Sequence, residues 1–382
     1  MKSSFSESLS IYINLLKTTM GCGILKYPYL FQVYGIIPCI LLTIISALSS
    51  YSGIVLYIDL NDKYGRNSTL STVSLHFKPY LKLLADIVVI FKCYTVSIAY
   101  LVYLKSQLIF LTDYYNLPIN VYFLLLLIVI LISPFILMNK LDKLKYTSSL
   151  GLLAILFLMS TSLYRYLSLE KSHILGMDSG NRSYINNLCH FVFSFTCHQN
   201  IFTAQNEMIS YNSRVLKLTA LFSFISASLV YLIFGLISYM AFGDSIQTSF
   251  IDTHPSDGVK VSLSIFYIFL LALSIPLQTN PCKQYLLNMV NEKYLKDEKY
   301  KKVCYFTSVS MILSIYLLSC TNIEFDSMCK LIGGTFSTCM CFIFAGMYHF
   351  LSCKMTENRI NNILAVVSLS YGVLSFCSVL NN

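Results

Sequence analysis

Long apolar runs, each of roughly twenty residues, recur from one end of this 382-residue sequence to the other. About 20 apolar residues make a helix long enough to cross the hydrocarbon core of a bilayer. Hydrophobic residues form 56% of the chain and charged residues only 12%, whereas a soluble protein carries about 25% charged residues. The pattern therefore predicts an all-α integral membrane protein that is a single transmembrane domain over residues 1–382.

The apolar runs divide into eleven expected spans, and the charges between them predict an orientation. Basic residues such as Lys140, Lys143 and Lys145 gather in the loops on one side, which the positive-inside rule places in the cytoplasm together with the N-terminus. This placement also accounts for the net charge of +9 without nucleic acid as a partner. The sequon at Asn181 then falls outside. The expected spans are 9–31, 35–60, 83–111, 118–138, a fifth ending near 167, 186–210, 215–242, 259–290, 303–320, 327–353 and 360–380.

The first span, around Asn14 to Phe31, contains features that a simple membrane helix does not need. Lys17 lies inside it, Gly21 and Gly23 flank a cysteine, and Pro28 follows within two turns. A helix that breaks within a membrane exposes backbone N–H and C=O groups, and transporters use such breaks to form a substrate site near the midplane. The alternative is tight helix packing, because Gly-x-Gly also lets two backbones approach closely.

The sixth span is also interrupted, because its centre is too polar to face lipid. Residues 194–207 hold hydroxyl, amide, imidazole and carboxyl side chains in close succession. These two spans would open the two halves, 9–167 and 186–353, of a five-plus-five inverted repeat, followed by an extra helix at 360–380. For Thr196 and Cys197, small-residue packing is the alternative to a binding role.

Four separated stretches resemble the amino acid/auxin permease family of eukaryotic amino acid transporters, within the amino acid–polyamine–organocation superfamily. They are NLLKTTMGCGILKYP in span 1, FSFTCHQNIFTAQNEM in span 6, YMAFGDSIQTSF after span 7, and IPLQTNPCKQYLLNMV in span 8. The resemblance implies eleven helices in the leucine-transporter type of fold, with helices 1 and 6 broken. Gln199 and Thr203 stand where many members have proline, and Lys26 and Tyr27 also depart from the family pattern.

The resemblance and the two breaks together predict how an amino acid would be bound. N–H groups around Gly21, Cys22 and Gly23 would hold its carboxylate, helped by the positive end of the following half-helix. Carbonyl groups near Phe195, Thr196 and Cys197 would hold its ammonium. The full set of expected substrate-binding residues is Thr19, Met20, Gly21, Cys22, Gly23, Phe195, Thr196, Cys197 and His198.

Four residues are candidates for coupling or gating. In sodium-coupled members of the family an asparagine in span 1 and a hydroxyl in span 8 hold the ion; the matching positions here are Lys17 and Ser274. An ammonium at Lys17 would occupy the place of sodium, which predicts proton coupling or facilitated exchange, unless the lysine snorkels to the interface. His198 either relays a proton or packs through a hydrogen bond. Glu207 either gates the inner side, paired with Arg214 or Lys17, or is a solvated helix end.

Three functional classes compete: a transporter, an amino acid sensor of the same fold, and a membrane enzyme. Only about ten residues precede span 1, whereas such sensors usually have a long cytoplasmic tail. Cys197 and His198 are neighbours and their side chains would diverge by about 100° on a helix, so no catalytic residue is expected. We expect a monomeric secondary transporter in the plasma or vacuolar membrane, with an amino acid, lipids and a possible coupling proton as partners and with no cofactor or metal. A sodium-coupled symporter is the other alternative.

Overall fold

The computed structural model describes residues 2–65, 69–137, 145–168, 187–208, 211–289, 297–352 and 359–380. Within these ranges every regular element is a helix. Seven helices there are long and apolar enough to cross a membrane, and two shorter apolar helices lie at the fourth and fifth expected spans. Spans 1 and 6 are each formed by short pieces, so the arrangement is compatible with eleven spans. The sequon at Asn181 and the inner loop with Lys140 and Lys143 lie outside the described residues.

The chain forms two compact units, and each expected repeat contributes to both of them. Unit 1 contains residues 1–85, 155–253 and 330–382, and unit 2 contains residues 86–154 and 254–329. Both interrupted spans belong entirely to unit 1.

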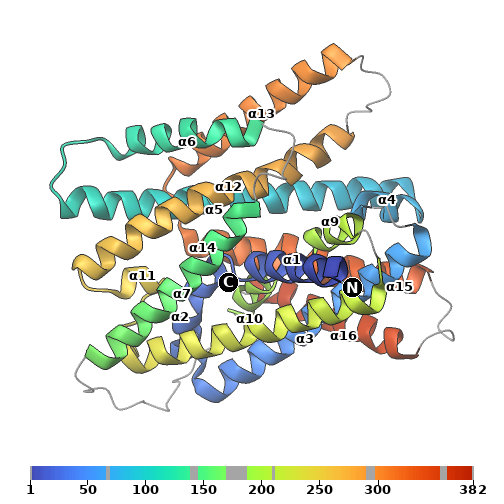
Figure 1. Ribbon diagram of the computed structural model, residues 1–382, viewed down its shortest axis with the longest axis horizontal. Helices are drawn as coiled ribbons and strands as arrows, with labels where there is room; N and C mark the ends of the chain where they lie inside the picture. Colours follow the sequence, from blue (N-terminus) through green and yellow to red (C-terminus); the bar gives the residue numbers. More distant parts are fainter. Residues whose placement is uncertain are drawn as a thin grey trace. The chain divides into compact units, whose positions relative to one another are not determined.

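In unit 1, the long helix α10 (Ser213–Phe242) is the common neighbour of the N-terminal elements. It packs against α1 (Lys2–Thr19), α2 (Tyr27–Tyr34) and α3 (Ile36–Tyr64), as can be followed in Figure 1. The last described helix, α16 (Arg359–Leu380), also packs on α3. The other elements are η1 (Cys22–Lys26), α4 (Leu70–Leu75), α8 (Leu188–Ser194), α9 (Gln199–Glu207), η3 (Gly243–Ser245), α11 (Phe250–Thr253), the π-helical η5 (Ile332–Ser337) and η6 (Cys339–Ile343), and α15 (Phe344–Ser352).

Unit 2 contains α6 (Val121–Leu137), α12 (Gly258–Met289) and α13 (Asp297–Ser319), which pack on one another (Figure 1). Buried lysines in this unit are hydrogen-bonded: Lys92 Nζ donates to Gln278 Oε1 at 3.3 Å, and Lys283 Nζ donates to the Ile136 carbonyl at 2.9 Å. These bonds offset part of the cost of burying a cation. Among the described helices, three have residues in both units: α5 (Pro79–Tyr114), α7 (Lys145–Ser168) and α14 (Phe325–Leu331).

Local sequence explains how span 1 connects to span 2. Pro28 lies in the first turn of α2, where its missing N–H costs nothing. Gly35 ends α2 with φ of 79°, a conformation that favours glycine, and its N–H donates to the Phe31 carbonyl at 2.9 Å. The chain then reverses into α3, so that α2 and α3 pack against each other.

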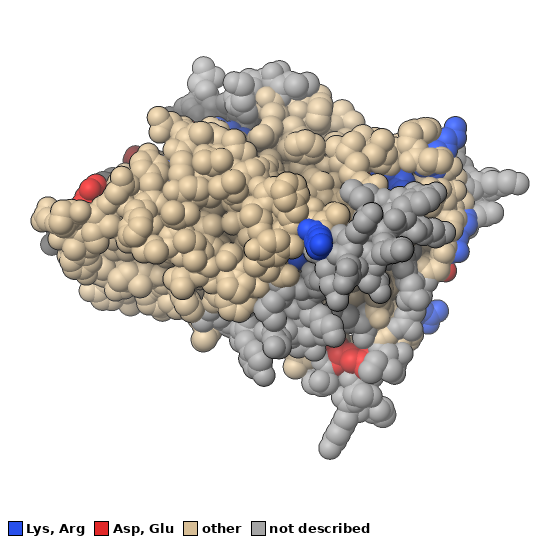
Figure 2. All heavy atoms as spheres, turned by 90° about the horizontal axis from the view of Figure 1, so that it is seen from above, with Lys and Arg blue, Asp and Glu red and all other residues tan. Residues whose placement is uncertain are grey.

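The described surface is largely apolar. Large side chains such as Leu131 (71% exposed), Phe306 (74%) and Ile360 (70%) project outward from the helices. Figure 2 shows that charged side chains occupy only small parts of the visible, described face. A surface of this kind suits hydrocarbon rather than water as its solvent.

Candidate functional site

The helix in span 1 is interrupted where the sequence predicts. The helix α1 ends at Thr19, and the Met20 N–H makes its last bond, to the Leu16 carbonyl at 2.9 Å. Gly21 follows with φ of −47° and ψ of −141°, and the chain then forms the short 3-10 helix η1 before α2 begins. The expected break in helix 1 is confirmed.

The helix in span 6 is interrupted over Phe195 to His198. The N–H of Phe195 is shared between the Phe191 and Val192 carbonyls, at 3.1 and 3.2 Å, which tightens the end of α8. The four residues from Phe195 to His198 belong to neither helix, and α9 begins at Gln199. Its first turn uses the Cys197 carbonyl, which accepts from the Asn200 N–H at 3.0 Å. The expected break in helix 6 is therefore also confirmed.

The break in span 1 leaves backbone hydrogen-bond donors without good partners, and the break in span 6 leaves backbone acceptors without partners. In the described part of the chain, no acceptor is seen for the N–H group of Gly23, and the N–H group of Gly21 makes no hydrogen bond of ordinary geometry. Likewise, no donor is seen there for the carbonyl oxygens of Phe195 and Thr196. Gly23, Phe195 and Thr196 are buried and Gly21 is half-buried. The neighbouring expected site residues Thr19, Met20, Cys22, Cys197 and His198 are buried as well. Unpartnered backbone in this setting is a site able to accept a polar ligand.

The two breaks touch each other. A Cβ added to Gly23 would lie 2.6 Å from Ser194 Oγ and 2.8 Å from Ser194 Cα, so the glycine lets η1 approach the end of α8. A second contact joins the two spans, because the side-chain amide of Asn200 in α9 donates to Thr18 Oγ1 in the last turn of α1 at 2.7 Å. Close packing and helix breakage are thus not alternatives in this chain, because Gly23 takes part in both.

A tyrosine that the sequence did not single out lies between the breaks. The Tyr231 hydroxyl of α10 donates to the Thr19 carbonyl at 2.6 Å and to the Ser194 carbonyl at 2.8 Å. Its ring is fully buried. Within span 7 this residue is one of many apolar or aromatic side chains, so no pattern marks it.

The imidazole of His198 packs against α3. Its Nε2 lies 2.9 Å from the Ser50 carbonyl oxygen, and a Cβ on Gly53 would lie 2.9 Å from the same nitrogen. The rings of Tyr57 and Phe342 meet the imidazole edge-on. These contacts agree with the packing alternative for His198, and a role in proton relay stays a prediction.

The three other coupling or gating candidates lie on separate elements. Lys17 is half-buried in the last turn of α1, in unit 1. Ser274 belongs to α12 in unit 2, where its hydroxyl donates to the Leu270 carbonyl at 2.8 Å. Glu207 ends α9, and its side chain lies outside the described residues, so its predicted pairing is not tested.

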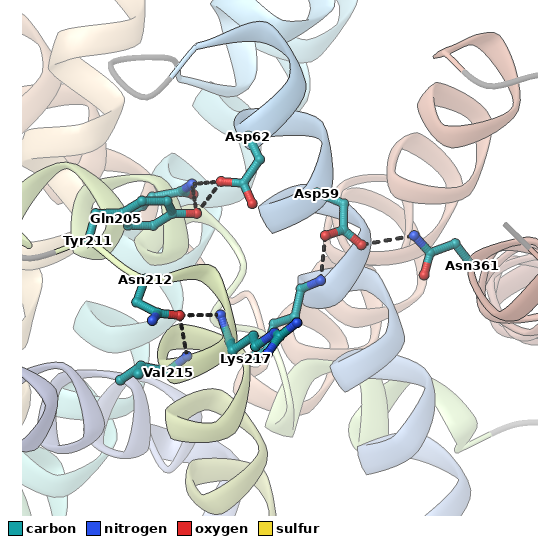
Figure 3. A network of polar contacts seen from close by, with 9 residues as sticks. Asp59, Asp62, Gln205, Tyr211, Asn212, Val215, Lys217 and Asn361 are labelled. Atoms are coloured by element: carbon teal, nitrogen blue, oxygen red, sulfur yellow. Dashed lines mark hydrogen bonds and ion pairs between the residues drawn. The ribbon is translucent and has the colours of Figure 1, made fainter. Parts of the chain in front are cut away.

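A polar network ties the ends of several unit 1 helices together, as Figure 3 shows. The Asp59 carboxylate of α3 pairs with Lys217 of α10 and accepts from the Asn361 amide of α16 at 2.9 Å. One turn along α3, Asp62 accepts from Tyr211 and from the Gln205 amide of α9 at 3.3 Å. Burial and the hydrogen bond to Asp62 raise the pKa of Tyr211 well above its usual range.

Helices broken in spans 1 and 6, both within one unit of an all-helical membrane protein, define a class: carriers of the inverted-repeat type with discontinuous helices. The model of the family described as "Transmembrane amino acid transporter protein" matches residues 6–381. The chain belongs to this family, the amino acid/auxin permeases, as the motifs indicated. Family membership identifies a transporter rather than an enzyme.

Relatives and a solved structure agree with this assignment. The chain is 25% identical to "Vacuolar amino acid transporter 5" of Schizosaccharomyces pombe, over 100% of this chain and 94% of the relative. It is 23% identical to the protein of the same name from Saccharomyces cerevisiae, over 88% and 87%. The structure described as "Crystal structure of MhsT in complex with L-phenylalanine" matches with a TM-score of 0.61 at 12% identity, covering 97% of this chain and 98% of the other. The likeness confirms the predicted fold class.

Proposed function

We propose that this protein moves amino acids across a membrane by alternating access, as a secondary transporter. The observation that carries the proposal is the contact of the two breaks, with Gly23 of span 1 packed on Ser194 of span 6. Both relatives described above have names that say they transport amino acids. We extend that substrate class to this chain on the strength of the shared family.

The backbone at the breaks suits a zwitterion. The N–H groups of Gly21 and Gly23 lie at the start of the outer half of span 1, where a helix carries partial positive charge and attracts a carboxylate. The carbonyl groups of Phe195 and Thr196 follow the end of α8, where a helix carries partial negative charge and attracts an ammonium. An amino acid carries both charges a few ångströms apart, and few other small metabolites do.

We further propose that transport does not require sodium, and that a proton is the coupling ion if there is one. Lys17 stands on α1 in the last turn before the break, and its ammonium would compete with a sodium ion there. We place the N-terminus in the cytoplasm, because the basic loops gather on that side. The membrane is vacuolar or plasma, and we expect a monomer.

A panel of labelled L-amino acids tests the proposal with the full-length protein in proteoliposomes. Uptake is measured for each at an acidic and a neutral external pH, with sodium chloride or with choline chloride. We expect uptake of a subset of amino acids, without a sodium requirement. Saturable binding without uptake would point instead to a sensor. Uptake only with sodium would contradict the assigned role of Lys17.

A further inference from the structure

Tyr231 makes contact with the last carbonyl group of two interrupted helices at once. Thr19 is the last residue of α1, and Ser194 is the last residue of α8. The hydroxyl oxygen lies 2.6 Å from the Thr19 carbonyl oxygen and 2.8 Å from that of Ser194. A hydroxyl has a single hydrogen, so the two carbonyls share it in a three-centre bond.

Two helix ends that converge in this way need a donor between them. The last carbonyls of a helix have no partner within it, and they carry the negative end of its dipole. Two such oxygens repel each other in a medium of low dielectric, and the repulsion favours pulling the breaks apart. A phenolic hydrogen placed between them converts the repulsion into two attractions.

The ring of Tyr231 is held from both sides by residues of the same two spans. It stacks on Tyr27, with centroids 4.2 Å apart and planes at 13°. Tyr27 opens α2, on the far side of the break in span 1. The ring of Phe195, inside the break in span 6, meets Tyr231 edge-on at 5.4 Å and 80°. The hydroxyl therefore has little freedom to leave the two carbonyls.

We infer that Tyr231 is a positioning residue that fixes the breaks of spans 1 and 6 relative to each other. Through the Thr19 and Ser194 carbonyls it sets the spacing between the N–H groups at Gly21 and Gly23 and the carbonyls at Phe195 and Thr196. The part of this role that concerns amino acid binding rests on the proposed function. The part that concerns the backbone does not.

Substitution Tyr231→Phe removes only the hydroxyl and keeps the stacked ring. The matched control is Tyr12→Phe, because the Tyr12 hydroxyl of α1 donates to Ser226 of α10 at 2.8 Å. That bond joins the same two helices but touches neither break. Both variants are made in the full chain and purified in the same detergent.

Hydrogen–deuterium exchange gives a readout that needs no substrate. In Tyr231→Phe, amides of residues 20–23 and 195–198 are expected to exchange about ten-fold faster, which corresponds to losing one or two buried hydrogen bonds. Tyr12→Phe is expected to leave both segments unchanged. Unchanged exchange in Tyr231→Phe, or an equal increase in the control, would overturn the inference. If Tyr231→Phe cannot be purified, hydrogen–deuterium exchange of the wild-type chain provides the test. Residues 20–23 and 195–198 are then expected to open together, and independent opening of the two segments would contradict the role of Tyr231.

Uptake tests the consequence for binding, with the single ³H-labelled amino acid that the wild-type chain takes up fastest in the panel as the probe. Tyr231→Phe is expected to raise the half-saturating concentration about ten-fold, with a smaller change in the maximal rate. Tyr12→Phe is expected to keep the wild-type value. An unchanged half-saturating concentration in Tyr231→Phe would count against the inference. If the wild-type chain takes up nothing, the proposed function fails, while the exchange experiment still decides the role of Tyr231.

Discussion

Gly23 lies against Ser194 so closely that no side chain fits between them: a Cβ on residue 23 would be 2.8 Å from the Ser194 Cα. Because this Cα belongs to the backbone, turning the Ser194 side chain alone would not relieve the contact. Relative motion of η1 and the end of α8 would therefore have to break this contact. This contact joins the two discontinuous helices directly.

The first prediction concerns this contact. Substitution Gly23→Ala is expected to push η1 away from α8 and to lower the free energy of unfolding by about 1–3 kcal/mol, as other overpacked sites do. The chain has no tryptophan and 13 cysteines. A thiol-reactive dye that reports exposure of buried cysteines can therefore measure the melting temperature.

Gly258→Ala is the matched control, because a Cβ on Gly258 would meet nothing within 4 Å. It also lies at the start of a helix, α12, where alanine is well tolerated. Equal melting temperatures for Gly23→Ala and Gly258→Ala would show that η1 and α8 are not in the contact described.

The second prediction concerns the ion pair of Asp59 and Lys217. The two side chains are only 28% and 26% exposed, and Asp59 also accepts from Asn361, which fixes its carboxylate. A double-mutant cycle with Asp59→Asn and Lys217→Met is expected to give a coupling of about 0.5–1 kcal/mol. The coupling should shrink as the salt concentration rises. Strict additivity of the two single variants at low salt would mean that the pair contributes nothing to stability.

The third prediction concerns the pH dependence of stability at Tyr211. Burial and the neighbouring Asp62 raise the pKa of its phenol in the folded chain. Below the ordinary pKa of about 10, both states are protonated and the phenol makes no difference. Above it, the unfolded chain loses the proton and the folded chain keeps it, so the folded state loses stability as pH rises.

When the pH rises from neutral to above 10, the melting temperature of Tyr211→Phe is therefore expected to fall less than that of the wild type. Tyr80→Phe serves as the control, because Tyr80 is 60% exposed. Its melting temperature should change with pH as that of the wild type does. If Tyr211→Phe follows the wild type as well, the phenol is not held protonated in the folded state.

The two breaks could be predicted because each has a local chemical cause. In span 1, Gly21 and Gly23 loosen the helix and Pro28 restarts it; in span 6, polar side chains crowd into a few turns around His198. Glycine, proline and polar density are visible in any single sequence, and their effect on a membrane helix follows from backbone hydrogen bonding.

Other parts of the site depend on contacts far apart in the sequence, and single-chain patterns do not encode those. Tyr231 is 212 residues from Thr19, and its neighbours in span 7 are as apolar and aromatic as those of any span. Asp59 and Asp62 lie near the end of span 2 and look like ordinary solvated charges. Their partners come from the packing of α3 against α9, α10 and α16 and from Tyr211, which lies just before α10.

The last prediction concerns Lys17 and follows from the chemistry of its replacement. An asparagine at this position supplies a carbonyl oxygen, which is a ligand that a sodium ion accepts, and removes the ammonium that would repel the ion. Methionine removes the ammonium as well but brings only a thioether, which is a poor ligand for a hard cation. Uptake by Lys17→Asn is therefore expected to be stimulated by sodium, whereas uptake by Lys17→Met is not. The measurement is initial uptake with sodium or choline at constant pH. Equal stimulation of both variants would trace the effect to the loss of charge alone, and no stimulation of Lys17→Asn would leave the lysine as an interfacial residue that does not exclude sodium.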